Sequence, residues 1–278
     1  MKPLIGILGL GSMGDPIARR LVEAGYIVVG HDINPAAAKK LATAGGRIVS
    51  STEQLAKESD LLLVLLVDDL QVRDACTGAG KIIANMKSDT VVVIMSSVSP
   101  DLCLELANEA ESKGVHVIDA PMVRGEAAAS AGTILLLLGG SSAIVRRCLP
   151  VFKCFATDWS HLGAVGSGQV AKMANNMLLW SAVVANYESL EFARSLGIDL
   201  KILRETLKIS SGDNWALRSW DLLTAQAKWW DQKDLSGLLE TAKRHNVDMP
   251  LTRILLEMMK PLRPQVAQKL LGGRKPSA

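Results

Sequence analysis

Short apolar runs alternate with helical patterns through the first half of the chain. Six runs are continuously apolar rather than alternating, at residues 4–8, 27–30, 61–66, 91–95, 115–118 and 133–140. Such runs are typical of strands buried on both faces, as in a parallel sheet covered by helices. Helical patterns opened by Asp, Asn, Ser or Thr lie between them, at residues 15–25, 34–46, 52–59 and 99–114. This alternation predicts a doubly wound α/β domain.

The second half of the sequence is helical in pattern. Residues 168–197 form one uninterrupted helical pattern, and a helix of that length would be about 40 Å long. Because a small domain cannot bury such a helix alone, we expect a homodimer or homotetramer assembled through it. Shorter helices are expected at residues 199–209, 215–228, 234–245 and 250–271. The sequence therefore predicts an α/β domain over residues 1–162 and an all-α domain over residues 163–278, joined by the long helix.

Composition narrows the class of protein. The 278 residues are 49% hydrophobic and 21% charged, as in a globular protein with room for two cores. A net charge of +3 with interspersed cations gives no surface for nucleic acid. The four Cys and four His show no metal-ligand spacing, so we expect no metal and reduced, mostly buried thiols. The longest apolar run, residues 61–67, is far shorter than the ~20 residues that cross a bilayer. These features predict a soluble cytoplasmic protein without membrane partners.

A glycine-rich segment carries the first chemical signal. Gly9, Gly11 and Gly14 follow the first apolar run and open a helical pattern, and Asp32 ends the next run, 18 residues after Gly14. This G-x-G-x-x-G arrangement lets backbone and helix N-terminus approach a pyrophosphate, while the acid accepts hydrogen bonds from ribose hydroxyls. The alternative is a purely structural glycine turn. The predicted cofactor-binding residues here are Gly9, Leu10, Gly11, Ser12, Met13, Gly14, Asp32, Ile33 and Asn34.

Asp32 also favours one cofactor over another. Its charge would repel the 2′-phosphate of NADP, and neither Ile33 nor Asn34 supplies a cation to offset that repulsion. The sequence therefore predicts NAD as the cofactor, in preference to NADP.

A lysine opens the long helical pattern. In GSGQVAKMANN, Lys172 and Asn176 are four residues apart and share a helix face. The residues on either side of Lys172 are apolar, so we expect this turn to be largely buried. Burial lowers the pKa of a lysine and suits it to exchange protons near neutral pH. The alternative is a lysine on a solvated helix face.

Six motifs together resemble a known family. They are GLGSMGDPIARRLVEAG, SSVSP, DAPMVRG, GTILLLLGG, GSGQVAKMANN and KDL at residues 233–235. In this order and spacing the chain resembles, over nearly its whole length, the β-hydroxyacid dehydrogenases related to 3-hydroxyisobutyrate dehydrogenase. The resemblance implies a Rossmann domain followed by a helical domain, assembled as dimers or tetramers. It also implies hydride transfer between a substrate's hydroxyl carbon and a nicotinamide.

The resemblance further implies roles for individual residues. Lys172 would be the catalytic general acid/base, with Asn176 beside the substrate. Further residues would contact the cofactor, namely Leu66, Val67, Ser97 and Lys233. The substrate would bind at Met122, Val123, Arg124 and Gly125.

This sequence departs from the family pattern in its substrate loop, which in such enzymes usually reads Asp-Ala-Pro-Val-Ser-Gly-Gly. Val123 and Arg124 stand at the Ser and the following Gly. Arg124 adds a guanidinium that can bind an anion through two parallel hydrogen bonds. We therefore predict a small 3-hydroxy acid that carries an extra anionic group. The alternative is a solvated Arg124 paired with Glu126.

Two further departures lie elsewhere. Ile94 replaces an Asp that often precedes the serine pair, which we interpret as a change of packing. The segment AKWWDQKDL, residues 227–235, is compressed.

Two rival functions remain on the sequence alone. One is imine reduction on the same fold, although those enzymes usually carry Asp or Tyr at the position of Lys172. The other is a non-catalytic dinucleotide-binding scaffold, a class that typically loses this lysine. A screen of small hydroxy acids with NAD separates the rivals, because a scaffold would bind cofactor without turnover.

Overall fold

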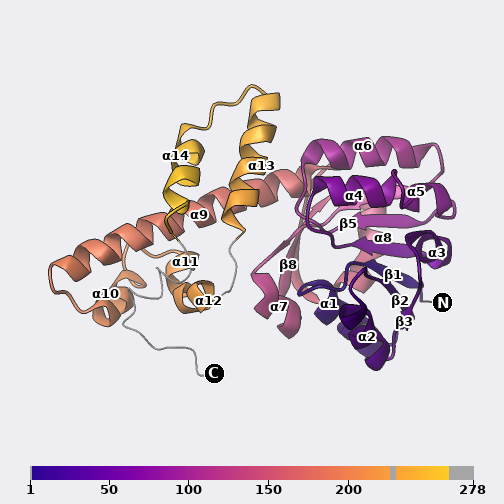
Figure 1. Cartoon of the computed structure of the whole chain (residues 1–278), viewed down its shortest axis with the longest axis horizontal. Coiled ribbons are helices and arrows are strands. Elements are labelled where there is room, and N and C mark those ends of the chain that lie inside the picture. Colours follow the sequence, from indigo (N-terminus) through magenta and orange to yellow (C-terminus); the bar gives the residue numbers. More distant parts are fainter. Residues whose placement is uncertain (1, 226–229, 263–278) are drawn as a thin grey trace. The chain divides into compact units, whose positions relative to one another are not determined.

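The structure of the chain is a computed structural model that describes residues 2–225 and 230–262. It divides into two compact units, Met1–Lys172 and Met173–Ala278. The division falls inside helix α9 (Ser167–Ser195), and each unit is described by itself below. Figure 1 labels the elements of both units.

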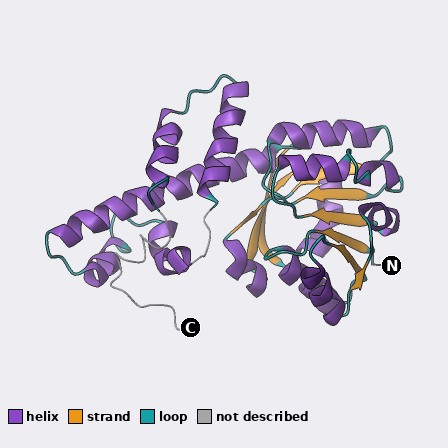
Figure 2. Ribbon diagram, viewed as in Figure 1, coloured by secondary structure: helices purple, strands orange, loops and turns teal. Residues whose placement is uncertain are grey.

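The first unit is built on one nine-stranded sheet, shown in Figure 2. Its strands β3, β2, β1, β4, β5 and β6 are parallel and adjacent in that order. Strand β8 then runs antiparallel to β6 and β7 and parallel to β9. The strand bounds are β1 Ile5–Leu8, β2 Val28–His31, β3 Arg47–Ile48, β4 Leu61–Val64, β5 Val91–Ile94, β6 His116–Asp119, β7 Met122–Val123, β8 Ile134–Gly139 and β9 Ala156–Gly163.

All six predicted apolar runs form strands, which makes the first unit the doubly wound α/β domain that the pattern predicts. Three strands were not predicted. Strands β3 and β7 have two residues each, too few for a pattern. Strand β9 pairs with β8 and is mostly exposed, and four of its eight residues are polar, so it contains no continuous apolar run.

Helices cover both faces of this sheet. One face carries α1, α2, α7 and α8, and the other carries α3, α4, α5 and α6, as their buried residues show. The bounds are α1 Gly14–Glu23, α2 Pro35–Thr43, α3 Thr52–Glu58, α4 Asp69–Cys76, α5 Ile82–Asn85, α6 Pro100–Glu111, α7 Gly125–Ala131 and α8 Ser142–Phe152. The four predicted helices are α1, α2, α3 and α6; no start signal was recognised for the others.

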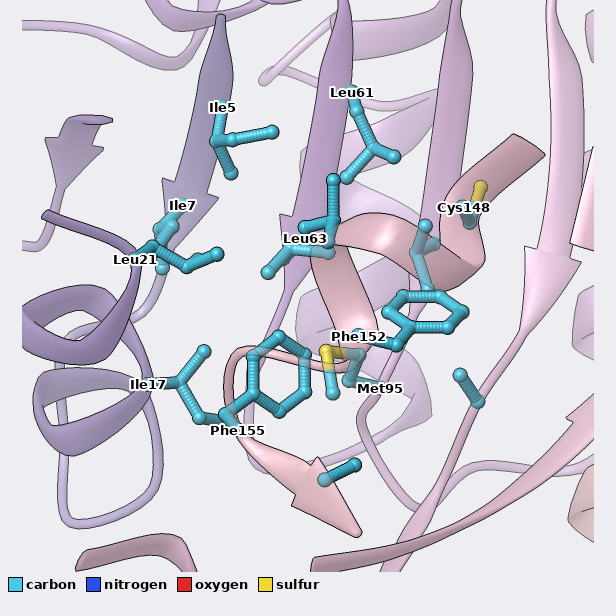
Figure 3. Packing of buried hydrophobic residues seen from close by; sticks show 14 of the residues in the cluster. Ile5, Ile7, Ile17, Leu21, Leu61, Leu63, Met95, Cys148, Phe152 and Phe155 are labelled. Carbon is cyan, nitrogen blue, oxygen red and sulfur yellow. The ribbon is translucent and has the colours of Figure 1, made fainter. Parts of the chain in front are cut away.

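The core of the first unit follows the alternation of each strand. Ile5 and Ile7 of β1 face the layer of α1 and α8, whereas Leu8 belongs to the cluster on the opposite face. Figure 3 shows the first of these clusters, where Phe152 and Phe155 lie edge to face with ring centroids 6.1 Å apart. Both faces are thus apolar, which explains why the strands read as continuous apolar runs.

The second unit is helical in its described residues. After α9 come α10 Leu200–Leu207, α11 Trp215–Arg218, α12 Trp220–Ala225, α13 Asp231–Arg244 and α14 Pro250–Met259. Trp180 and Val183 of α9 pack with Trp220, Leu235 and Leu255 in its core. Helices α10, α13 and α14 correspond to the helices expected at residues 199–209, 234–245 and 250–271, although α14 ends at Met259. The single helix expected over residues 215–228 is instead two helices, α11 and α12, divided at Ser219. The parts of these predictions over residues 226–228 and 263–271 lie outside the described residues. Among the helices of the described chain, none combines the length and apolarity needed to cross a membrane.

The first turns of α9 belong to the sheet unit. The sequence placed the domain boundary near residue 163, whereas the compact units divide after Lys172. The physical reason is that backbone N–H groups at Gly166 and Gln169 donate to the buried carboxylate of Asp119 in β6. Lys172 is therefore grouped with the sheet rather than with the helical unit.

Candidate functional site

The glycine turn lies at the point where the strand order of the sheet reverses. Strand β1 has β2 on one side and β4 on the other. At the end of β1, the Gly9 N–H donates to the His31 carbonyl at 3.0 Å, and the Leu65 N–H donates to the Leu8 carbonyl at 2.8 Å. Ligands of open α/β sheets bind in the crevice at such a switch point.

The three glycines of this turn have different surroundings. Gly9 has a φ of +92°, and a Cβ there would overlap the Leu65 carbonyl oxygen. A Cβ on Gly14 would overlap the Gly9 carbonyl oxygen, so the first turn of α1 packs directly on the loop. A Cβ on Gly11 would meet nothing within 4 Å. Gly9 and Gly14 are thus required by the fold, whereas Gly11 faces open space, as expected of a glycine that admits a pyrophosphate.

Asp32 follows β2 and lies against the glycine turn. Its Oδ2 accepts a hydrogen bond from the Leu10 N–H at 2.7 Å, and its Oδ1 accepts one from the Asn34 N–H at 2.7 Å. Each carboxylate oxygen has a second lone pair, so ribose hydroxyls can still donate to it. Asn34 caps helix α2, and the side chain of Ile33 between them is 95% exposed. These residues fit the adenosine end of a dinucleotide.

The segments after β4 and β5 are joined to each other. The Ser96 Oγ accepts from the Leu66 N–H at 2.7 Å and donates to the Val64 carbonyl at 3.3 Å. Val67, the next residue, is 47% exposed. Leu66 and Ser97 therefore lie on two connected segments at the carboxyl edge of the sheet, beside the glycine turn.

The predicted substrate loop begins with a short strand rather than with irregular chain. Met122 and Val123 form β7 and pair with Leu136 and Leu135 of β8. The side chain of Val123 is buried. Arg124 and Gly125 then have φ values of 83° and 74°, and a Cβ on Gly125 would meet nothing within 4 Å.

Arg124 has an acidic partner that the sequence did not indicate. Its Nη1 lies 2.6 Å from Oδ2 of Asp158 in β9 and also donates to the Thr133 carbonyl and the Thr157 hydroxyl. The alternative in the sequence analysis paired Arg124 with Glu126, whereas the structure pairs it with Asp158. The Arg124 guanidinium and the Thr157 hydroxyl hold the pKa of Asp158 below its usual range. All three of these hydrogen bonds use one guanidinium nitrogen.

The turn that carries Lys172 is less buried than its apolar neighbours suggested. Lys172 is half-buried, Val170 is 57% exposed and Ala174 is exposed. The prediction of a largely buried turn was wrong, because the apolar residues on either side of Lys172 do not all face the sheet. Lys172 therefore combines partial burial with access from solvent.

Comparison with known families places the chain. The model of the NAD-binding domain of 6-phosphogluconate dehydrogenase matches residues 4–166. The NAD-binding domain of NADP-dependent 3-hydroxyisobutyrate dehydrogenase matches residues 166–270. The chain belongs to the β-hydroxyacid dehydrogenase family. The predicted resemblance and the predicted fold class are both confirmed.

Relatives within the family span much of the chain. The human mitochondrial 3-hydroxyisobutyrate dehydrogenase is 33% identical over 77% of the chain, which spans 64% of that relative's length. The 2-(hydroxymethyl)glutarate dehydrogenase of Eubacterium barkeri is 31% identical over 91% of the chain and 87% of its own length. A solved structure of 3-hydroxyisobutyrate dehydrogenase from Mycobacterium tuberculosis with L-serine has a TM-score of 0.87 at 27% identity, covering 98% of the chain and all of that protein.

Two family-implied site residues lie in the second unit. Asn176 is buried in α9, and its Oδ1 accepts from Asn175. Lys233 lies in α13. The compressed segment beside it is only partly described, since residues 226–229 fall outside the described chain. The roles of Asn176 and Lys233 rest on the family resemblance alone. Within the described chain, no group of three or more His, Cys, Asp or Glu side chains is arranged to hold a metal ion.

Two buried polar residues at this site were missed by the sequence analysis. Asp119 is fully buried at the end of β6, and Gln169 is 1% exposed at the start of α9. Both lie in the quoted motifs, yet nothing in either motif shows that they meet across 50 residues of chain.

Proposed function

We propose that the chain is an NAD-dependent dehydrogenase that interconverts a small 3-hydroxy acid and its carbonyl product. The observation that carries this proposal is the placement of the glycine turn, Asp32, the Ser96 segment and the Lys172 turn within one compact unit. The glycine turn and Asp32 fit a dinucleotide, whose nicotinamide would accept or supply the hydride. Lys172 would take the hydroxyl proton during oxidation and return it during reduction.

The assay is a panel of small hydroxy acids with NAD or NADP. Appearance of reduced nicotinamide with at least one 3-hydroxy acid is the expected result. Tight dinucleotide binding without turnover of any hydroxy acid would instead favour a non-catalytic dinucleotide-binding scaffold. Reduction of cyclic imines, with no oxidation of hydroxy acids, would favour an imine reductase.

The preference for NAD rests on Asp32. Its carboxylate carries a negative charge at the place where a ribose 2′-phosphate would bind, and repulsion would weaken NADP. Asp32→Ser should therefore bring the dissociation constant for NADP closer to that for NAD. The same change removes the bond to Leu10, so the variant's melting temperature must be compared with that of the parent. Equal kcat/KM for NAD and NADP in the unmodified protein would contradict the preference.

The proton transfer rests on Lys172. Lys172→Ala should lower kcat by about 10²- to 10⁴-fold, the usual effect of removing a positioned acid/base. The dissociation constant for NAD should change little, because the glycine turn and Asp32 are untouched. Near-normal turnover in this variant would remove Lys172 from the chemistry.

The substrate class rests on Arg124. We propose that its guanidinium binds a second anionic group of the substrate, through nitrogens other than the Nη1 that faces Asp158. The relative from Eubacterium barkeri supports this, because 2-(hydroxymethyl)glutarate carries two carboxylates. The competing explanation is structural, since the Asp158 pair joins the end of β7 to β9.

A pair of variants separates these explanations. Arg124→Ala should lower kcat/KM by about tenfold to hundredfold for dicarboxylates and sulfonates, and less for monocarboxylates. Asp158→Asn removes the competing carboxylate and should raise kcat/KM for the same dianionic substrates. If the pair only holds β9 in place, both variants will lower the melting temperature and neither will change the ratio of dianionic to monoanionic substrates.

We also propose a homodimer or homotetramer assembled through α9. Large apolar side chains of the second unit remain exposed in the single chain. Four such residues are each at least 65% exposed: Leu178 and Phe192 of α9, Leu196 in the turn after α9, and Ile202 of α10. Burying such side chains against a second copy would stabilise an assembly by about 25 cal/mol for each Å² of apolar surface.

A further inference from the structure

We infer that Gln169, fixed by Asp119, is the positioning residue that holds the Lys172 turn against the Ser96–Val98 segment. The inference deepens the proposed function, on which the catalytic roles of Lys172 and Ser97 rest. It concerns residues within the first compact unit only.

Asp119 anchors the start of α9 to the sheet. Its Oδ1 accepts from the Gly166 N–H at 2.6 Å, and its Oδ2 accepts from the Gln169 N–H at 2.9 Å. A carboxylate at a helix N-terminus satisfies otherwise unpaired N–H groups and faces the positive end of the helix dipole.

The packing around Asp119 leaves the helix little freedom. A Cβ on Gly168 would lie 2.7 Å from Oδ2 of Asp119, and a Cβ on Gly139 would overlap its Oδ1. Burial raises the pKa of Asp119, and the backbone N–H bonds partly oppose that shift. The Asp119 carboxylate is therefore in close contact with Gly139, Gly168 and the first N–H groups of α9.

Gln169 joins this anchored helix to the segment after β5. Its Nε2 donates to the Ser96 carbonyl at 2.9 Å, and its Oε1 accepts from the Val98 N–H at 3.2 Å. One buried side-chain amide therefore satisfies the backbone on both sides of Ser97. Ser96 in turn binds the Leu66 N–H through its hydroxyl.

These bonds make one network out of three segments that the proposed function uses separately. The network runs from Leu66 through Ser96 to Gln169, and Lys172 lies three residues further along the same helix. A shift of about 1 Å at a reacting group can cost about 10²-fold in rate. Gln169 therefore sets the distance between the proton-transferring lysine and the segment proposed to face the nicotinamide.

The test uses Gln169→Met, which keeps the length of the side chain and removes both amide bonds. We expect kcat to fall about tenfold to hundredfold. The dissociation constant for NAD should change less than about threefold, since the glycine turn and Asp32 make none of the hydrogen bonds that the substitution removes. Val170→Ala is the matched control on the same turn, because the Val170 side chain is 57% exposed and makes none of the hydrogen bonds of the network.

Gln169→Glu is the conservative companion. It retains an acceptor for the Val98 N–H but sets a carboxylate oxygen against the Ser96 carbonyl, and should therefore restore little of the lost kcat. A purely structural Gln169 predicts a lower melting temperature with kcat per folded molecule within twofold of the parent, and that result would overturn the inference.

Amide hydrogen exchange supplies a readout that does not depend on turnover. Gln169→Met should increase exchange at residues 96–98 and at residues 166–172 together, because the amide bridges them. Increased exchange in only one of the two segments would overturn the inference, whether or not the protein oxidises a hydroxy acid. An inactive parent protein would instead count against the proposed function.

Discussion

At the scale of single residues, amino acids of the same type in this chain have different surroundings and therefore different roles. Gly9 and Gly14 are needed because a Cβ would overlap backbone oxygens of the fold itself, whereas Gly11 has open space where a Cβ would be. The four thiols likewise differ in burial, since Cys76, Cys103 and Cys148 are buried and Cys154 is half-buried.

A first prediction contrasts two glycine variants. Gly14→Ala should destabilise the protein by about 1–3 kcal/mol or more, because the added methyl overlaps the Gly9 carbonyl. Gly11→Ala should leave the free energy of unfolding within about 0.5 kcal/mol of the parent and weaken dinucleotide binding. Denaturant unfolding and titration with NAD measure the two effects. Unchanged NAD affinity in Gly11→Ala would show that this face of the turn does not receive the pyrophosphate.

A second prediction concerns the buried thiols. Burial raises the pKa of Cys148 to about 12 from an ordinary value of 9.0. Between those two pH values the unfolded chain loses the thiol proton and the folded chain keeps it. Stability is therefore fully present below pH 9 and falls as pH rises toward 12, by about 1.4 kcal/mol per pH unit for one thiol. Cys148→Ala should reduce this alkaline slope by about one proton in unfolding measurements between pH 8 and pH 10.5.

At the scale of elements, the loops at the carboxyl edge are held by side chains at helix N-termini. Ser99 caps α6 by accepting from the Leu102 N–H, and both its hydroxyl and its N–H donate to Asp69 in α4. Asp119 likewise caps α9, because its carboxylate accepts from the Gly166 and Gln169 N–H groups. Such caps orient a helix relative to the strand before it, and so fix the segments that carry Ser97 and Lys172.

The cap of α6 can be tested with a matched pair on one helix. Ser99→Ala should cost about 1–2 kcal/mol of stability, since it removes the cap and a partly buried hydrogen bond to Asp69. Ser112, at the other end of α6, donates only to the exposed Glu109 carbonyl, and Ser112→Ala should cost less than about 0.5 kcal/mol. Equal losses in chemical denaturation would mean that the cap contributes nothing specific.

At the scale of the whole molecule, the chain consists of two compact units with separate cores, divided within one 29-residue helix. The sheet unit is apolar on both faces and covered by helices. The helical unit has its own aromatic core around Trp180 and Trp220, yet α9 leaves large apolar side chains exposed. Exposed apolar side chains that lie close together are typical of a surface that contacts another protein.

The proposed assembly is tested at those side chains. Phe192 lies in the last turn of α9 and is 69% exposed, and Leu196 follows the end of that helix and is 65% exposed. Changing both to Glu should reduce the mass measured by light scattering from that of an oligomer to that of one chain. Ile27→Glu is the control, because Ile27 is 67% exposed in the sheet unit. A parent protein that is monomeric at micromolar concentration would contradict the assembly.

The sequence by itself determined six of the nine strands, the long helix α9 and the family. Continuous apolar runs identify strands that are buried on both faces, because only such strands can dispense with polar residues. The glycine turn and Asp32 are recognisable because their spacing is local, within one strand–helix–strand unit. Short strands β3 and β7 and the exposed strand β9 were missed, since two residues or an edge position leave no apolar pattern.

Only the tertiary structure decided which polar groups meet. Asp119 and Gln169, Gln169 and Ser96, and Arg124 and Asp158 are pairs separated by tens of residues. The exposure of Val170 was equally hidden, because burial depends on which helix face the sheet covers and not on the polarity of neighbours in the chain. Local spacing encodes periodicity and turns, whereas long-range hydrogen bonds depend on how the strands are ordered, and that order exists only in the folded chain.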